Sequence, residues 1–268
     1  MNTRDGLFFL VVGVASFTGA LLVNQKTLDN ELSRHWETHA SQLSTPQALP
    51  DFSAIAQMPT KKEAFLAYLV PFVQKENERI LVERNWLAKL SERYTRVGYL
   101  TGSQRLTLMQ LANRYRLSAE SMAEPEIIQE LLQRVDIVPV SLVLSQSANE
   151  SGWGTSRFAV VGNNLFGQWC FSQGCGIVPE ARRTGLTHEV ARFNSPAESI
   201  ASYMRNLNTN YAYRGFRELR QVMRDEAQSL DSIKLAEKLD RYSTRGFAYV
   251  QDLKAMILLN DLSRYDTI

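Results

Sequence analysis

The 268-residue sequence contains few histidines, few cysteines and almost no net charge. His35, His39 and His188 are too scattered along the chain to predict a metal site. Cys170 and Cys175 lack the C-x-x-C spacing of redox and zinc motifs. A net charge of +2 gives no reason to expect a nucleic-acid partner. We therefore expect neither a metal, nor another cofactor, nor bound nucleic acid.

Internal repeats and low-complexity tracts are also absent, and 44% of the residues are hydrophobic, as in a globular protein of one or two domains. A long apolar run, "GLFFLVVGVASFTGALLV", lies within residues 1–24. Its position predicts a targeting element and not a core helix. An uncleaved signal anchor and a cleaved signal peptide both fit, and we favour the anchor. We therefore expect a periplasmic protein that is tethered to the inner membrane.

Helical periodicity dominates the rest of the chain. We expect a polar linker over 25–60, a helical region over 61–120 and a second domain over 121–268. The helical pattern of 61–96 contains Pro71, which should kink or split the helix because proline lacks a donor N–H. Further helices are predicted at 103–115, 124–136, 139–152, 195–207, 230–242 and 247–263.

A β-hairpin is predicted at one place, within "GIVPEARRTGLTHEVARFN". Two short strands there flank a turn at Thr184 and Gly185. The expected fold is therefore α+β and mainly α, with a small hairpin lobe.

Glu150 is the first candidate for a catalytic acid. It stands in "ANESGWG", near the end of the predicted helix 139–152, and continues the core-facing stripe of that helix. Apolar surroundings and the negative end of the helix dipole both disfavour an ionised carboxylate, as a proton donor requires. Trp153 is expected to add an apolar wall. From this segment alone, a structural ion pair with Arg157 is the competing interpretation.

The run "VSLVLSQSANESGWGTSRFAVVGNNLFGQWC" resembles the glucosaminidase family of peptidoglycan hydrolases, which belongs to the lysozyme-like superfamily. Within the family, the "WCF…GCG" pair resembles the Bax subgroup. The resemblance extends through "FNSPAESIASYMRNLNTNYAYRGFRELR" and "AEKLDRYSTRGFAYVQDLKAMI" and covers roughly residues 125–265. It implies that 121–268 is a lysozyme-like catalytic domain, which cleaves the β-1,4 bond after N-acetylglucosamine in peptidoglycan glycan strands.

The resemblance also implies roles for individual residues. Glu150 matches the catalytic acid of the family's E-S-x-W-G motif, and Trp153 falls in the same motif. Asn163, Asn164 and Phe166 match the family's N-N-L-F-G stretch along the substrate cleft. From the residues alone, the two asparagines predict a left-handed turn, whose amides either bind sugar acetamido groups or are purely structural.

A second carboxylate is expected on the hairpin, where the family places it. Glu180 precedes the Thr-Gly turn, as the family's acid does, and is the preferred second acid. Glu189 is the alternative. Both would be exposed strand residues in the competing interpretation, and a substrate acetamide that acts as nucleophile would remove the need for either.

Three tyrosines complete the predicted site. Tyr242 matches a functional tyrosine in the family's Y-A-T-D context, although Arg245 stands where the family has the acidic residue. It is expected to stabilise the oxocarbenium charge or to hold the acetamido group, with a core tyrosine as the alternative. Tyr211 and Tyr213 are expected to stack on sugar rings, with ordinary packing as the alternative.

The remaining expectations concern the cysteines and the reaction. In an exported protein, Cys170 and Cys175 are close enough in sequence to close a small disulfide loop. Hydrolysis of peptidoglycan is the favoured activity. A lytic transglycosylase with one catalytic glutamate and a catalytically silent peptidoglycan-binding protein are the two alternatives.

Overall fold

The computed structural model describes residues 32–34, 36–180, 182, 185 and 187–266. The described helices and strands are, in chain order, η1 (Phe52–Ala54), α2 (Met58–Val97), α3 (Gly102–Arg114), α4 (Glu124–Arg134), α5 (Val140–Ser151), α6 (Arg157–Gly162), β1 (Trp169–Cys170), β2 (Gly176–Ile177), β3 (Glu189–Ala191), α7 (Pro196–Thr209), η2 (Tyr211–Tyr213), α8 (Arg214–Asp225), α9 (Ser232–Ala236), α10 (Phe247–Leu259) and η3 (Leu262–Tyr265). The expected targeting segment, residues 1–24, lies outside this part of the chain. Within it, no helix is both long and apolar enough to span a membrane.

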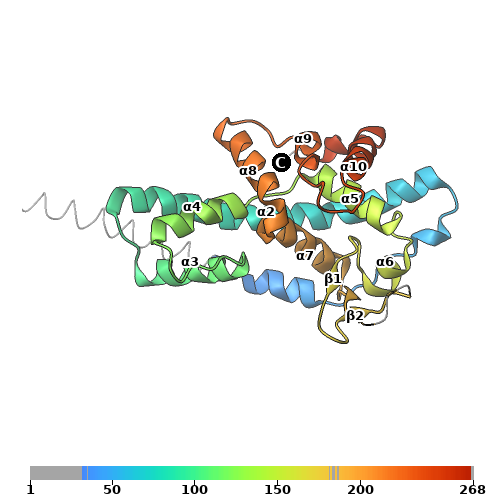
Figure 1. Cartoon of the computed structure of the whole chain (residues 1–268), viewed down its shortest axis with the longest axis horizontal. Coiled ribbons are helices and arrows are strands. Elements are labelled where there is room, and N and C mark those ends of the chain that lie inside the picture. The colour runs from blue at the N-terminus through green and yellow to red at the C-terminus, as the bar shows by residue number, and fades with distance from the viewer. Residues whose placement is uncertain (1–31, 35, 181, 183–184, 186, 267–268) are drawn as a thin grey trace, which may run out of the picture.

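The long helix α2 organises the fold. It runs along the length of the molecule, with α3 and α4 towards one end and α5, α6 and α10 towards the other (Figure 1). Pro71 lies on the exposed face of α2 and does not split it, because the Ala67 carbonyl that loses its N–H partner faces water. A continuous hydrophobic cluster joins the whole, from Phe65 on α2 through Leu142 on α5 to Leu253 on α10.

The sheet is small, antiparallel and ordered β1-β3-β2. Strands β2 and β3 pair Gly176 with Ala191 and Ile177 with Val190, which confirms the predicted strand pairing. The predicted turn residue Thr184 lies outside the described residues. Strand β1 was not predicted, and it pairs Trp169 with Val190 on the other edge of β3. The prediction of a mainly helical α+β fold is therefore confirmed.

Helix α5 is the element that carries Glu150. Its N-cap is Pro139, its C-cap is Gly152 in the left-handed conformation, and most of its residues are buried on every side. Because Pro139 has no side chain to cap the first turn, Asp266 does so from the C-terminal end: Ser141 N donates to its Oδ1 at 2.8 Å. The helix is therefore fixed at both ends.

Sequence reasoning missed helices α6 and α8, in addition to the helical residues 36–44 that are described below. Helix α6 has only six residues. Helix α8 buries Arg217 and Arg220 beside Phe216 and Met223, so its inner face does not read as an apolar stripe. The helix predicted at 230–242 was too long, because only α9 forms there.

Part of the predicted linker is packed against α2. Residues 36–44 are helical, and the Trp36 indole donates to Glu83 at 2.7 Å. His39 Nε2 lies 2.7 Å from Glu76, which also accepts from Arg79 at 2.8 Å. This segment therefore meets a buried, charged seam of α2. The predicted domain boundaries stay predictions.

The ion pairs of Glu76 predict that the free energy of unfolding decreases at acid pH. Burial alone raises the pKa of Glu76, but the Arg79 charge and the bonds from His39 and Arg79 outweigh it and lower the pKa to about 2. Because the folded-state pKa lies below the unfolded one, the carboxylate stabilises the fold above the unfolded pKa. That contribution, about 3 kcal/mol, is lost as the pH falls towards the folded pKa.

We expect Glu76→Gln to flatten this acid dependence in urea unfolding between about pH 6 and pH 3. Glu63→Gln, on the exposed face of the same helix, is the matched control and should keep the wild-type slope. Equal slopes for wild type and Glu76→Gln would contradict the assignment.

Candidate functional site

Glu150 lies in the last turn of α5 and is half-buried. The Asn149 amide donates to its Oε1 at 3.3 Å. Its Oε2 faces Gly167: a Cβ atom added to Gly167 would lie 3.9 Å from this oxygen, and the glycine has a positive φ of 64°. The structure therefore brings together the E-S-x-W-G and N-N-L-F-G motifs, and no side chain stands between them at Gly167.

Three phenols share the electrostatic surroundings of Glu150: Tyr203 and Tyr249 are buried and Tyr242 is partly buried. Burial raises the pKa values of Tyr203, Tyr242 and Tyr249 above the usual tyrosine range. The negative charge of Glu150 contributes to all three shifts. At neutral pH these groups are therefore uncharged hydroxyls, which can still donate and accept hydrogen bonds.

Tyr242 links the N-N-L-F-G stretch to the C-terminal helices. Its hydroxyl donates to the Phe166 carbonyl at 2.8 Å, and its ring stacks on Tyr249 with centroids 5.6 Å apart. Arg245, which stands in place of the family's acidic residue, pairs with Asp252 at 2.6 Å. The structure thus places Tyr242 and Phe166 beside each other, in the neighbourhood of Glu150.

The side chains of Asn163 and Asn164 form hydrogen bonds with backbone groups of other segments. Asn163 has a φ of 51°, so the predicted left-handed turn is confirmed. Its side chain accepts from Leu49 N at 3.1 Å and donates to the Gln47 carbonyl at 3.1 Å. Asn164 is buried and donates to the Ala191 carbonyl at 2.8 Å. These bonds support the structural alternative, and a direct role in substrate binding stays a prediction.

The two hairpin carboxylates differ sharply. The Glu180 side chain is 83% exposed and pairs with Arg157 at 3.0 Å, so this arginine serves the hairpin and not Glu150. Glu189 is buried, contrary to the exposed position expected in the structural interpretation. Hydrogen bonds from the Gly174 and Gly176 amides, at 3.0 and 2.8 Å, lower its pKa.

A family profile described as mannosyl-glycoprotein endo-beta-N-acetylglucosaminidase matches residues 125–262. The chain is also similar to protein bax of Escherichia coli strain K12, with 36% identity over 209 residues that cover 78% of this chain and 73% of that protein. The chain belongs to the glucosaminidase family. The similarity to protein bax confirms the Bax-like subgroup. No solved structure gave a significant match.

Membership of the glucosaminidase family supports glycosidase activity for this chain. The matched region contains α5 with Glu150, the N-N-L-F-G stretch and Tyr242. Helices α2 and α3 precede it. The residues that carry the candidate site therefore lie within the family's own region.

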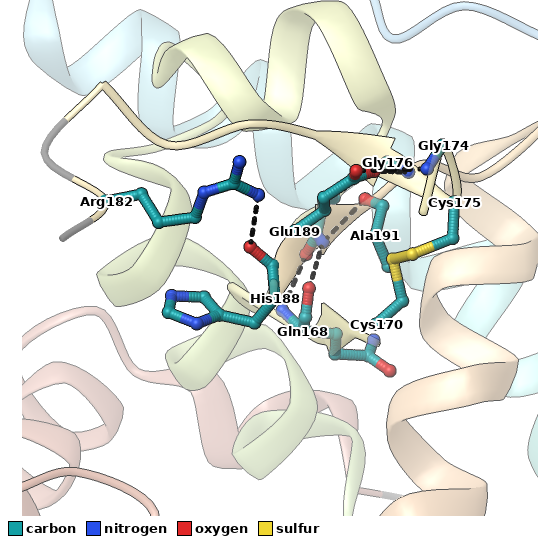
Figure 2. Close-up of a disulfide and its surroundings, with 10 residues drawn as sticks. Gln168, Cys170, Gly174, Cys175, Gly176, Arg182, His188, Glu189 and Ala191 are labelled. Atoms are coloured by element: carbon teal, nitrogen blue, oxygen red, sulfur yellow. Dashed lines mark hydrogen bonds between the residues drawn. A yellow bond between two sulfur atoms is a disulfide. The ribbon is translucent and has the colours of Figure 1, made fainter. Parts of the chain in front are cut away.

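The disulfide of this glucosaminidase-family chain closes the loop between β1 and β2. Cys170 and Cys175 are bonded, with Cα atoms 6.2 Å apart, as expected. Glu189 holds the same loop from β3 through its two amide contacts (Figure 2). Glu189 is thus part of the loop's own scaffold, and this leaves Glu180 as the hairpin carboxylate that solvent and ligands reach.

The remaining predicted aromatic residues have separate surroundings. The Trp153 ring meets Phe65 edge-to-face at 5.8 Å and is buried, so it packs on α2. Tyr211 is 83% exposed, whereas Tyr213 is buried beside Tyr242. Burial raises the pKa of Tyr213 to about 12. Of these three residues, Tyr211 alone offers a sugar an open ring face, and their roles in binding stay predictions.

Sequence reasoning missed three residues of the site: Gln146, Tyr203 and Tyr249. Gln146 is fully buried one turn before Glu150, and a polar residue within an apolar stripe is a signal that it needs partners. The two tyrosines lie on the inner faces of α7 and α10, where the sequence pattern does not distinguish them from core residues.

Proposed function

We propose that this chain is an exported glycosidase that hydrolyses the β-1,4 bond after N-acetylglucosamine in peptidoglycan, with Glu150 as the general acid. The setting of Glu150 carries the proposal. Its carboxyl group is half-buried, lies at the end of a helix fixed at both ends, and faces the bare Gly167. A group held this rigidly can protonate the oxygen that leaves the anomeric carbon.

Charge that develops on the sugar must also be stabilised. Glu180 is the candidate second acid, and its ion pair with Arg157 would have to open or shift before it acted as nucleophile or base. The substrate's own acetamide is the alternative nucleophile. Tyr242 and Phe166 are proposed to lie beside the reacting sugar, whereas Tyr203 and Tyr249 are buried.

We further propose that the protein works in the periplasm, tethered to the inner membrane through residues 1–24. The disulfide supports export, since such bonds persist in oxidising compartments. Peptidoglycan glycan strands are then the substrate within reach.

Product analysis tests the reaction. We expect a digest of purified peptidoglycan to contain fragments with new reducing N-acetylglucosamine ends, identified by mass spectrometry after borohydride reduction. Anhydro-muramic ends would instead identify a lytic transglycosylase, which needs only one carboxylate. An undigested sample, with protein retained on the sacculi, would identify a binding protein.

A further inference from the structure

One turn before Glu150, helix α5 takes part in a series of buried hydrogen bonds that the proposed reaction does not by itself explain. Gln146, one turn earlier on α5, donates from Nε2 to the Tyr249 hydroxyl at 2.8 Å. On its other side, Gln146 Oε1 accepts from the Tyr203 hydroxyl. All three residues are buried, and they come from α5, α7 and α10.

The chemistry of the Gln146 amide fixes which group donates and which accepts in each of these hydrogen bonds. An amide oxygen only accepts and an amide NH₂ only donates, so Tyr203 uses its proton on Gln146 and Tyr249 receives one from it. The Tyr249 oxygen is thus an acceptor for Gln146, and its own proton remains available. Glu150 lies one turn after Gln146 on the same face of α5. Its negative charge is also among the causes that raise the pKa of Tyr249.

We infer that Tyr249 is a positioning residue for Glu150: its hydroxyl donates to the Glu150 carboxyl group, and Gln146 and Tyr203 fix the direction of that bond. The inference rests on the proposed role of Glu150 as general acid. A carboxylic acid donates its proton from one oxygen only, so its orientation decides whether that proton faces the substrate. Asn149 binds Oε1, and Oε2 faces Gly167. A further donor from Tyr249 holds the carboxyl group in this orientation.

Packing alone is the competing explanation, because the Tyr249 ring stacks on Tyr242. Tyr249→Phe separates the two, since phenylalanine keeps the ring and loses only the hydroxyl. We expect kcat on peptidoglycan to fall about 10- to 100-fold, the loss of one hydrogen bond to a charged group, while KM changes little.

The matched control is Tyr115→Phe. Tyr115 is also buried and donates to a carboxylate, Glu83, at 2.6 Å, but it lies in the α2–α4 region. We expect it to lower the melting temperature without changing kcat per folded molecule. If Tyr249→Phe lowers kcat no more than Tyr115→Phe does, the inference is overturned.

A second measurement does not depend on activity. Thermal unfolding of Tyr249→Phe, Glu150→Ala and the double variant forms a cycle, and contact between the two groups predicts that their effects are not additive. Additive effects would overturn the inference. Non-additive effects in a chain that cleaves no peptidoglycan would keep the contact and reject the proposed function, so the two failures are distinguishable.

Discussion

Replacement of Glu150 by glutamine is expected to slow peptidoglycan cleavage by about 10²- to 10⁴-fold, or about 3–5 kcal/mol of transition-state stabilisation. Glutamine keeps the shape of the side chain and an oxygen that accepts from Asn149. What it cannot supply is an acidic proton for the leaving oxygen. Zymography on sacculi and the rate of release of soluble fragments both measure the loss.

The controls separate a catalytic loss from an unfolded protein. Glu150→Gln should melt within about 2 °C of wild type, because the half-buried group takes part in no ion pair among the described residues. Glu218→Gln, on the exposed surface of α8, should keep full activity. Clearing by Glu150→Gln equal to wild type would reject Glu150 as the acid.

The activity of Glu180→Gln, measured in the same assays as Glu150→Gln, tests whether Glu180 is the second catalytic carboxylate. Glu180 is the sequence-based candidate, yet it is exposed and paired with Arg157. A loss comparable to that of Glu150→Gln would establish it as nucleophile or base. Activity close to wild type would transfer that role to the substrate acetamide.

Local signals explain which parts of the fold were predictable. Helix α5 is bounded in sequence by Pro139 and Gly152, and the N-cap of α7 is Ser195, whose hydroxyl accepts from Glu198 N at 3.2 Å. Periodicity and caps depend only on neighbours in sequence, so both helices were found close to their true limits. The pairing of β2 with β3 was predictable for a similar reason, because the two strands lie close together in sequence.

Tertiary contacts explain what was missed. The inner face of α8 contains Arg217 and Arg220, whose acceptors are carbonyls from other segments of the chain. No local pattern shows those partners. The same holds at Asn163, whose amide is bound by Gln47 and Leu49, residues that sequence reasoning assigned to a linker.

The candidate site shows the same limit. The resemblance predicted Glu150 and Tyr242, and the structure places both in one electrostatic environment. It gave no reason to name Gln146 or Tyr249, because a tyrosine on a helix's inner face is ordinarily a core residue. The hydrogen bond between them, across α5 and α10, places the Tyr249 hydroxyl against α5 one turn before the acid.

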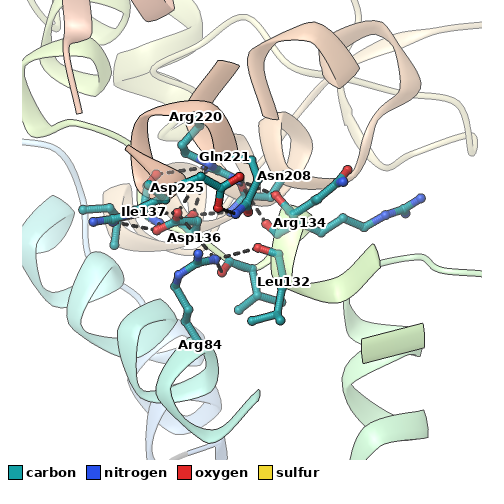
Figure 3. Close-up of polar contacts among 12 residues, drawn as sticks. Arg84, Leu132, Arg134, Asp136, Ile137, Asn208, Arg220, Gln221 and Asp225 are labelled. Carbon is teal, nitrogen blue, oxygen red and sulfur yellow. Dashed lines mark hydrogen bonds and ion pairs between the residues drawn. The ribbon is translucent and has the colours of Figure 1, made fainter. Parts of the chain in front are cut away.

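Arg220→Met is expected to cause the largest loss of stability among the substitutions considered. Arg220 is almost completely buried on α8 and donates to the carbonyls of Asp136 and Ile137 and to the Asn208 side chain, all within 3.0 Å. Its other amino group donates to the Gln133 carbonyl, near the end of α4. Figure 3 shows it beside Asp136, which Arg84 approaches from α2.

The size of the loss follows from what methionine leaves behind. Burial lowers the pKa of Arg220 to about 10, so the side chain is still charged at neutral pH. Methionine fills most of the volume of the arginine side chain but donates no hydrogen bond, so several buried carbonyl oxygens lose their donor. The buried Asp136 also loses one neighbouring cation. Breaking such a network costs about 3–5 kcal/mol, and the melting temperature should fall by roughly 10 °C.

Arg214→Met, on the same helix, is the matched control. Its side chain is 79% exposed and pairs with Glu218 one turn away, so its removal should cost less than about 0.5 kcal/mol. Similar melting temperatures for the two variants would contradict the assigned role of Arg220. Below its melting transition, Arg220→Met should keep most of its activity per folded molecule, because none of its contacts reaches Glu150. Glu150→Gln should show the reverse, with stability kept and activity lost, so the two variants together separate the stability of the contact between α4 and α8 from the chemistry at the end of α5.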